Sequence, residues 1–241
     1  MSDTRGLLGK RYQNLYSGYY QGNALAKRET SAVQTVNQMQ RVLGDLVVDK
    51  LIDVGAGEGS VLRQISQRAL ARELHATEIS ESGVEAIKAK EIPLLSSVQL
   101  SDGYRIPYSN KHFDLAITIH VLEHVEHERL FLQEIRRISR RAYIEVPLEH
   151  GFSIKRSIAA GTQYGHINFY MIATLRSLLE SCGFTVTQCG VFASSLQYEQ
   201  CVSGGTKGWL KHLLRTTALH VGPSLAPWFF VFNGCALCEC N

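Results

Sequence analysis

The sequence predicts an α/β fold in which a mostly parallel sheet carries helices on both faces. Three observations predict it. A strand-sized apolar segment runs directly into a glycine-rich turn at Leu51–Ser60, a carboxylate follows about twenty residues later at Glu78, and strand-sized apolar runs then alternate with helical stretches as far as Val191. Because neighbouring parallel strands need a crossover, usually a helix, this alternation indicates a parallel sheet.

The glycine-rich turn is the motif around which the chain is organised. Leu51–Val54 is predicted to be a short buried strand, and a helix is expected to begin near Ser60. Glycines at 55, 57 and 59 allow backbone dihedrals closed to other residues, and they lack the β-carbons that would hold a ligand away. The N-terminus of the following helix offers N–H groups and a positive dipole end to an anionic or carboxylate-bearing ligand. The alternative is a tight connection that binds nothing.

The spacing of the glycines narrows the class of ligand. They follow G-x-G-x-G, whereas the dinucleotide fingerprint G-x-G-x-x-G would need a glycine at Ser60. Glu78 lies near the end of the predicted strand Leu74–Ile79, where doubly wound folds place a carboxylate that accepts both ribose hydroxyls. Ser80 is expected to cap the next helix, which fixes Glu78 at the carboxyl end of its strand.

The segment before the turn is predicted to be an arm and a helix. Residues 1 to about 25 are rich in glycine and tyrosine and either fold over the ligand or pack as a frayed terminus on a neighbouring surface. Residues from about Ala26 to Leu46 have a helical apolar spacing and are expected to cover one face of the sheet. We therefore divide the chain into 1–46, an N-terminal arm and helix, and 47–241, the ligand-binding domain.

Two loops after Glu78 carry candidate site residues. A short strand at Val98–Leu100 leads into Asp102-Gly103, a pair that is also a common turn dipeptide. The next expected strand is Phe113–His120, and a helix is expected to begin directly after it, at His120-Val-Leu-Glu-His124. This helix would bring residues 120, 123 and 124 onto one face.

The second half of the chain is expected to complete the sheet. A strand at Arg141–Pro147 is followed by a long glycine-containing loop that holds His150 and His166. The remaining expected elements are a helix at Ile172–Cys182, a strand at Phe184–Val191, an insertion at 193–226 with a helix from about Trp209, and a final antiparallel strand at Trp228–Cys238.

Composition excludes several other classes of protein. The 241 residues are 45% hydrophobic and 20% charged with a net charge of +3, and no basic face with interleaved aromatics suggests nucleic acid as a partner. We expect a cytoplasmic protein with no membrane span and with free thiols, and we assign no oligomeric state. The terminal Cys235, Cys238 and Cys240 invite a zinc site, but their spacing also fits side chains along a last strand, and no second Cys/His pair completes a ligand set.

Taken together, these motifs resemble the class I S-adenosylmethionine-dependent methyltransferases, specifically the small-molecule branch that includes the ubiquinone and menaquinone methyltransferases. The resemblance covers about Leu51 to Val191, with Tyr108 and Met171 as departures from the usual residues. It rests on the segments Asp53-Val-Gly-Ala-Gly-Glu-Gly59, Glu78, Ile106-Pro-Tyr108 before Phe113-Asp114, His120-Val-Leu-Glu-His-Val125, and Gly165-His-Ile-Asn-Phe-Tyr170 before a helix that ends at Gly183-Phe184.

The resemblance implies a Rossmann-like sheet of seven strands whose last strand is antiparallel, with S-adenosylmethionine as cofactor, S-adenosylhomocysteine as product and a small-molecule acceptor. It assigns the methionine portion to the glycine turn and the main chain near His120, the ribose to Glu78, and the adenine to Asp102 and Gly103. The cofactor-binding residues so implied are Asp53, Gly55, Ala56, Gly57, Gly59, Glu78, Ile79, Asp102, Gly103 and His120.

Histidines are the candidate catalytic residues, because a neutral imidazole can remove a proton from the acceptor near neutral pH. His166 is the first candidate, and His150 and His120 are the others. Some methyltransferases of this fold hold a divalent metal with Glu-x-x-Glu-His and a later histidine, which His120-x-x-Glu123-His124 with His150 or His166 imitates. Because His120 replaces the first carboxylate, we assign no metal. Alternative functions are a non-catalytic ligand-binding module and a nicotinamide-dependent oxidoreductase.

Overall fold

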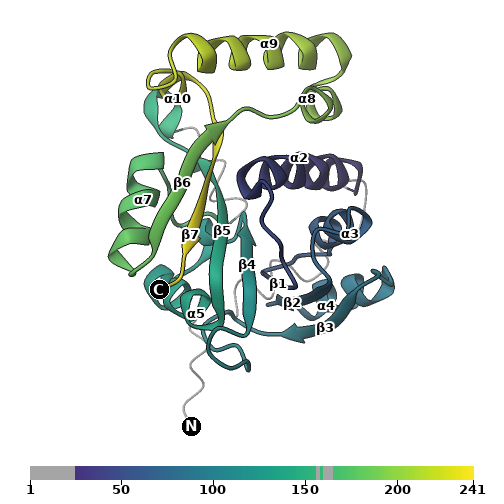
Figure 1. Cartoon of the computed structure of the whole chain (residues 1–241). Helices are drawn as coiled ribbons and strands as arrows, with labels where there is room; N and C mark the ends of the chain where they lie inside the picture. The colour runs from purple at the N-terminus through teal and green to yellow at the C-terminus, as the bar shows by residue number, and fades with distance from the viewer. Residues whose placement is uncertain (1–24, 156–157, 160–164) are drawn as a thin grey trace.

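Seven strands form a single sheet in the order β3-β2-β1-β4-β5-β7-β6 (Figure 1). The structure is a computed structural model that describes residues 25–155, 158–159 and 165–241. The strands are β1 (Lys50–Val54), β2 (Glu73–Glu78), β3 (Leu95–Leu100), β4 (Phe113–Ile119), β5 (Ser139–Leu148), β6 (Thr185–Phe192) and β7 (Phe232–Glu239).

The directions of the strands bring most of the loops that carry candidate site residues to one edge of the sheet. Strands β1 to β5 pair in parallel, and β7 pairs antiparallel with both β5 and β6. The carboxyl ends of all strands except β7 therefore lie along the same edge, where open α/β sheets bind ligands. This confirms the Rossmann-like sheet with an antiparallel last strand. The last strand lies inside the sheet, between β5 and β6, rather than at its border.

Helices cover both faces of the sheet. Buried side chains of α2, α3 and α4 meet one face, while those of α5 and α7 meet the other. The helices are α2 (Leu25–Leu43), α3 (Ser60–Gln67), α4 (Glu81–Ala89), α5 (Glu128–Ile138), α7 (Ile172–Ser181), α8 (Leu196–Ser203), α9 (Gly205–Val221) and α10 (Ala226–Phe229), with short 3-10 turns η1 (Leu122–His124) and η2 (Gly151–Ser153).

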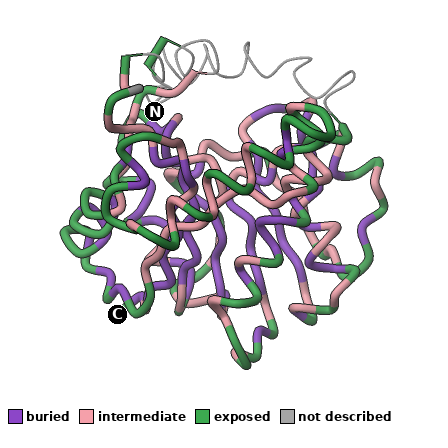
Figure 2. The backbone as a smooth tube through the Cα atoms, turned by 90° about the horizontal axis from the view of Figure 1, so that it is seen from above, coloured by how far each residue is buried: buried purple, intermediate pink, exposed green. Residues whose placement is uncertain are grey.

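The sheet has a hydrophobic core on each face, because successive side chains along a strand point to opposite faces. Ile52 and Ile144 join the cluster under α5 and α7, whereas their neighbours Leu51 and Tyr143 join the cluster under α2 and α3. Figure 2 shows the buried strands running through the centre of the molecule with exposed helical segments around them. This pattern is that of central strands covered on both faces, which holds the loops at the carboxyl edge in fixed positions.

Two predicted elements differ from the structure. Residues 120–124 do not open an α-helix: β4 ends at Ile119, residues 122–124 form the 3-10 turn η1, and α5 begins at Glu128. The last strand begins at Phe232 rather than Trp228, because Pro227 at the start of α10 favours a short helix there. The predicted N-terminal arm at 1–25 falls almost wholly outside the described residues.

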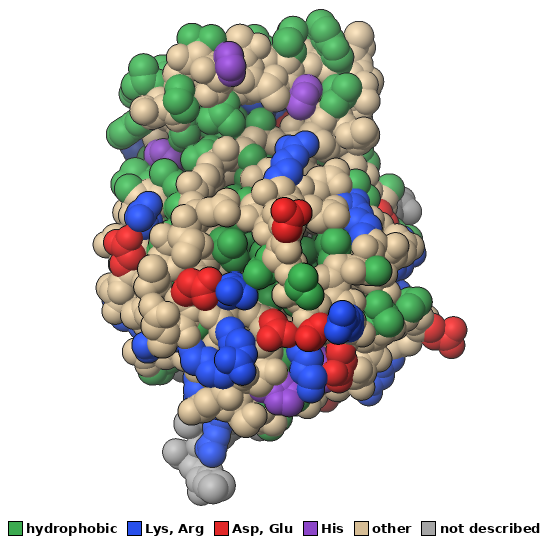
Figure 3. Space-filling model, viewed as in Figure 1, with side chains coloured by type: hydrophobic (Ala, Val, Ile, Leu, Met, Phe, Trp, Pro, Cys, Tyr) green, Lys and Arg blue, Asp and Glu red, His purple; other side chains and the backbone are tan. Residues whose placement is uncertain are grey.

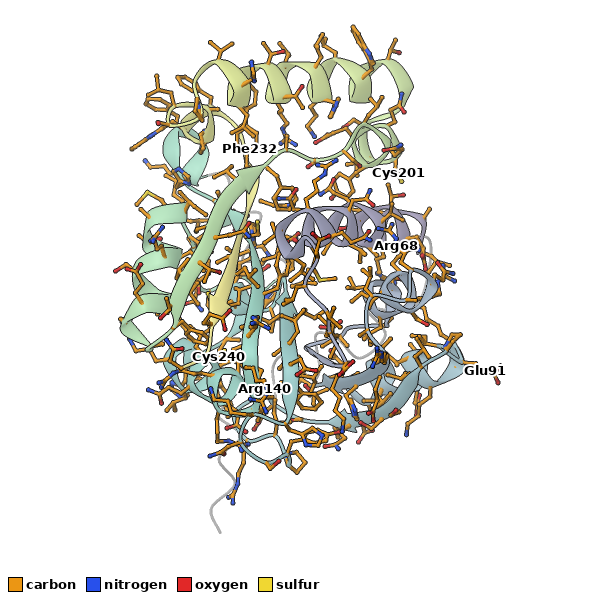
Figure 4. All side chains as sticks on the ribbon, in the orientation of Figure 1. Arg68, Glu91, Arg140, Cys201, Phe232 and Cys240 are labelled. Carbon is orange, nitrogen blue, oxygen red and sulfur yellow. The ribbon has the colours of Figure 1, made fainter. Side chains whose placement is uncertain are left out.

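The terminal cysteines do not converge on one point. Cys235 packs with the core under α2 and α3, whereas Cys238 and Cys240 pack with the core on the opposite face of the sheet. All six cysteines are free, and Cys201 lies on α8 at the other end of the molecule from Cys240 (Figure 4). The sheet alternation therefore explains their spacing as that of buried strand residues rather than of a zinc site.

The insertion between β6 and β7 forms α8, α9 and α10 at the carboxyl edge (Figure 1). In the described part of the chain, no helix combines the length and the apolar character needed to cross a bilayer.

Candidate active site

The glycine-rich turn links β1 to α3 and is tied to the neighbouring strand. The amides of Gly55 and Ala56 both donate to the carbonyl of Thr77, at 2.9 and 3.0 Å. The φ angles of Gly55, Gly57 and Gly59 are 87°, 59° and 84°, values that residues other than glycine rarely adopt. A β-carbon on Gly55 would lie 2.5 Å from Val121 Cγ2, so the turn also packs closely on the segment after β4.

Glu78 is the centre of the hydrogen bonds at this edge. It is 3% exposed, and its Oε2 accepts from the amide of Gly57 at 2.9 Å. Its Oε1 accepts from the amide and the hydroxyl of Ser80, at 3.0 and 2.9 Å. Burial raises the pKa of Glu78 although these hydrogen bonds favour its ionised form. One carboxylate thus holds together the turn after β1 and the first residues after β2.

Gly83, in the first turn of α4, is a site residue that sequence reasoning missed. Its amide donates to Ser80 Oγ at 3.1 Å, which makes Ser80 the expected cap of α4. A β-carbon at Gly83 would lie 2.6 Å from Glu78 Cγ and 2.8 Å from the Gly57 carbonyl oxygen. The signal was available, because a glycine inside a helix is unfavourable unless close packing requires it.

Asp53 is a second buried carboxylate beside Glu78. It is 2% exposed at the end of β1. Burial, and then the negative charge of Glu78, raise its pKa to about 8. A positively charged ligand would stabilise the ionised form of Asp53 against both burial and the charge of Glu78. This pair of carboxylates therefore suits a cationic ligand better than an anionic one.

The N-terminus of α3 is partly capped by the protein itself. Glu58 Oε2 accepts from the amide and the hydroxyl of Ser60, at 3.1 and 3.0 Å, and pairs with Lys90 Nζ at 2.9 Å. One of the N–H groups expected to face a ligand therefore already has a protein partner. The amides of the turn and the buried carboxylates remain as the groups that define this end of the site.

Asp102 and Gly103 follow β3 as predicted and form a tight turn. Asp102 Oδ1 accepts from the amide of Tyr104 at 3.0 Å, and the amide of Gly103 donates to Ser101 Oγ at 3.2 Å. Gly103 has φ of 79°, and a β-carbon there would lie 2.5 Å from Phe131 Cε2. Packing explains the glycine, while Asp102 and the half-buried Ile79 stay at the same edge as Glu78.

His120 lies between two buried carboxylates. Its Nδ1 is 3.3 Å from Glu123 Oε1 and its Nε2 is 3.4 Å from Glu145 Oε1. Burial alone would lower the pKa of His120, but its hydrogen bonds to these carboxylates and their charges outweigh burial and raise that pKa to about 10. Because the two carboxylates favour the protonated form of His120, this geometry argues for a positioning role rather than for a general base.

The backbone at His120 is also unusual. Its φ is 54°, in the left-handed region that residues with a β-carbon rarely adopt. Its amide donates to the carbonyl of Glu145 at 2.9 Å, which holds the residue at the end of the β4–β5 pair. Thr35 Oγ1 and Tyr143 Oη in turn donate to Glu145, each at 3.0 Å, so the strained residue is fixed by a buried network.

The segment Ile167–Tyr170 locks η1 in place. The amides of Ile167 and Asn168 donate to the carbonyl of Glu123 at 2.8 and 3.0 Å. The side-chain amide of Asn168 donates to the carbonyls of Leu122 and Val125 at 3.0 and 2.7 Å. These bonds bring His166 beside η1, which explains why the two histidine-containing motifs meet although they are far apart in sequence.

His166 is oriented by a carboxylate. Its Nδ1 lies 2.7 Å from Oε2 of Glu149, the residue after β5, and because a carboxylate only accepts, Nδ1 is the donor of this hydrogen bond. Glu123, His124 and His166 offer ligand atoms within 4.8 Å of one another, and they are the metal-ligand group found among the described residues. Glu123 also contacts His120, His166 contacts Glu149, and the rings of His124 and His166 pack against each other, while the buried Oε2 of Glu123 has no hydrogen-bond partner among the described residues. That this cluster binds no metal stays a prediction.

His150 lies apart from this group, against Trp228 of the insertion, with ring centroids 5.9 Å apart. Burial lowers its pKa. A cavity of about 550 Å³ lies between α2, the end of β6 and α9, and Gln34, Arg41 and His212 are among the residues that line it. None of the predicted cofactor residues borders this cavity, so we place the chemistry at the glycine turn and Glu78, where the buried carboxylates gather.

Comparison with known families decides the class of protein. A family described as "Methyltransferase domain" matches residues 24–189, more than half of the chain. The chain belongs to this methyltransferase family. The match begins at α2 and ends within β6, so it includes the glycine turn, Glu78 and the motifs at His120 and His166 but not the insertion.

Solved structures support the fold of the methyltransferase. The [4+2]-cyclase SpnF is 13% identical, with a TM-score of 0.62 over 87% of this chain and 81% of that chain. The geranyl diphosphate C-methyltransferase of Streptomyces coelicolor A3(2), in complex with Mg²⁺, geranyl-S-thiolodiphosphate and S-adenosylhomocysteine, is 10% identical, with a TM-score of 0.62 over 86% and 75%. The phosphoethanolamine N-methyltransferase 2 of Haemonchus contortus, in complex with phosphomonomethylethanolamine and S-adenosylhomocysteine, is 11% identical, with a TM-score of 0.62 over 95% and 59%.

These findings confirm an S-adenosylmethionine-dependent methyltransferase, with S-adenosylmethionine as the cofactor of the family. The two buried carboxylates of this methyltransferase fit such a cofactor. Its sulfonium and ammonium groups are positively charged, and a positive charge nearby would stabilise the ionised forms of Asp53 and Glu78.

Proposed function

We propose that this methyltransferase transfers the methyl group of S-adenosylmethionine to a small-molecule acceptor by in-line displacement. The observation that carries the proposal is the 2.9 Å hydrogen bond between the Gly57 amide and Glu78, which brings the two predicted cofactor-binding segments into one site. The absence of a basic stripe in the sequence and the likeness to enzymes with small acceptors support the acceptor class.

Each part of the cofactor has proposed partners in the chain. Gly55, Ala56, Gly57 and Gly59 surround the methionine portion together with Asp53 and the main chain at His120. Glu78, next to Ile79, accepts from the ribose hydroxyls, since each carboxylate oxygen can accept more than one hydrogen bond. Asp102 and Gly103 contact the adenine.

The protein supplies positioning and, where the acceptor carries a proton, a base. The sulfonium supplies the methyl group and the leaving group, so holding the acceptor in line is the main contribution of the chain. We assign proton removal to Nε2 of His166, because Glu149 orients its ring and stabilises the imidazolium that forms. The free cysteines support our further proposal that the enzyme works in a reducing compartment such as the cytoplasm.

Calorimetric titration with S-adenosylmethionine, S-adenosylhomocysteine and NADH tests this assignment. We expect both sulfur nucleotides to bind with micromolar Kd and NADH to give no heat of binding. Binding of NADH alone would favour the oxidoreductase. If none of the three binds, the proposed cofactor site is wrong.

The affinity for S-adenosylhomocysteine is expected to rise with pH. Asp53 is protonated below its pKa of about 8, and the ammonium group of the ligand favours its ionised form, so binding releases a proton. The affinity should rise by up to about tenfold per pH unit below pH 8 and level off above it. Calorimetry in two buffers of different ionisation enthalpy measures the released proton. Asp53→Asn should remove both effects, and a flat profile in the wild type would contradict the assignment.

A further inference from the structure

The insertion turns the apolar face of α9 outward. Trp209, Leu210, Leu213 and Leu214 recur at helical spacing and are 44 to 52% exposed, and Val221 near the end of the same face is 79% exposed. Most surface helices bury such a stripe against the core. In Figure 3 apolar side chains gather over α9 and α10 at the end of the molecule beyond the carboxyl edge.

Polar contacts fix this orientation. On the inner side of α9, Arg215 and Lys211 pair with Glu199 of α8, and Nδ1 of His212 lies 2.9 Å from the carbonyl oxygen of Ser194. Glu199 is fully buried, so this ionic contact anchors the helix with its polar face inward. Rotating α9 to bury its leucines would break these bonds and leave Glu199 buried without a partner, which is unfavourable.

The apolar surface continues from α9 onto its neighbours. Leu225, Trp228 and Phe229 are 66, 45 and 62% exposed, and Phe152 of η2 is 78% exposed. The ring of Phe152 packs 5.3 Å from that of Phe229, which joins the insertion to the loop after β5. We call this surface of α9, α10 and Phe152 the apolar cap. A contiguous exposed surface of this kind marks a site of interaction.

The charge of the insertion identifies the partner. Between Leu196 and Phe229 the only acidic residue is the buried Glu199, which pairs with Lys211 and Arg215, whereas Lys207 is exposed beside the apolar cap. An exposed face of leucine and tryptophan with lysine beside it is typical of helices that lie in the interface of an anionic bilayer. A second copy of the chain would bring like charges together across the contact.

We propose that the apolar cap docks on an anionic lipid bilayer, with α9 lying flat in the headgroup region. Trp209 and Trp228 insert at the interface, and Lys207 contacts the headgroups. The cap lies beyond the carboxyl edge of the sheet, so docking turns that edge toward the bilayer (Figure 1). This inference concerns the insertion and does not depend on the identity of the cofactor.

Flotation with lipid vesicles tests the proposal. We expect the full-length protein to float with vesicles of phosphatidylcholine and phosphatidylglycerol, and more weakly with phosphatidylcholine alone. Replacing Leu210 and Leu214 together by glutamate should weaken binding to the anionic vesicles by about tenfold or more, because two apolar anchors become charged. Lys207→Glu should weaken binding to the anionic vesicles and leave binding to neutral vesicles unchanged.

The matched control is Leu130→Glu on α5, where a leucine of 55% exposure lies outside the cap. It should bind vesicles like the wild type, and every variant should retain the wild-type titration with S-adenosylhomocysteine. A wild type that does not float, or an equal loss in Leu130→Glu, would overturn the proposal. So would a dimer in light scattering that the double substitution dissociates, since the cap would then cover a second copy.

Discussion

Replacing Glu78 by glutamine is expected to weaken binding of S-adenosylhomocysteine at least about 100-fold. The side chain accepts three hydrogen bonds, from the amides of Gly57 and Ser80 and from the Ser80 hydroxyl. Glutamine has the same size but turns one oxygen into an NH₂ group that faces an N–H donor. Each lost hydrogen bond to a charged group costs about 1.5–3 kcal/mol, and the ribose would lose its acceptor as well.

Calorimetric titration measures this change, with Glu81→Gln as the matched control. Glu81 is an exposed residue three positions later, in the first turn of α4, and its substitution should leave Kd unchanged. An affinity of Glu78→Gln within threefold of the wild type would remove Glu78 from the cofactor site.

Replacing Gly83 by alanine is expected to weaken the same binding by about tenfold to 100-fold. In an ordinary helix interior this substitution stabilises by about 1 kcal/mol. Here the added methyl group would lie 2.6 Å from Glu78 Cγ and 2.8 Å from both the Gly57 carbonyl oxygen and Ser80 Oγ. These three atoms belong to the proposed ribose-binding edge, so they must move, and such overpacking costs about 1–3 kcal/mol.

Titration and urea unfolding together measure the effect of Gly83→Ala. The control is Gly190→Ala in β6, where a β-carbon would have no atom within 4 Å and both affinity and stability should stay near the wild type. A stabilised Gly83→Ala protein with unchanged affinity would show that the close contact is not needed for the site.

The sheet and the cofactor edge could be predicted because their signals are local. The strand before Gly55, the glycine spacing and the carboxylate at Glu78 lie within one β-α-β unit, so the sequence order is also the spatial order. The cap of α4 by Ser80 was predictable for the same reason.

The environment of His120 could not be predicted, because it is made by contacts between distant segments. The helical spacing of His120, Glu123 and His124 suggested one helical face, but the left-handed backbone at His120 and the bonds from Asn168 impose a 3-10 turn instead. The pKa of His120 depends on Glu145, on another strand. Tertiary contacts here override a local pattern.

The roles of the individual site residues stay predictions. The structure brings Asp53, Glu78 and Asp102 to one edge and places His166 beside Glu123, and the substitutions above measure what these groups do. Gly83 joins that set because the structure shows which atoms α4 approaches there, Glu78 Cγ and the Gly57 carbonyl oxygen, whereas a glycine inside a helix indicates only that some close contact exists.

The position of β7 between β5 and β6 has a consequence for how this scaffold diversifies. Phe192 at the end of β6 pairs with Asn233 near the start of β7, so the insertion leaves and re-enters the sheet at adjacent points. A change in the length or sequence of the insertion therefore need not shift the pairing of β6 with β7, as with the loop of a hairpin. The outer surface of the insertion can therefore change without disturbing the hydrogen bonds between the strands at the candidate cofactor site.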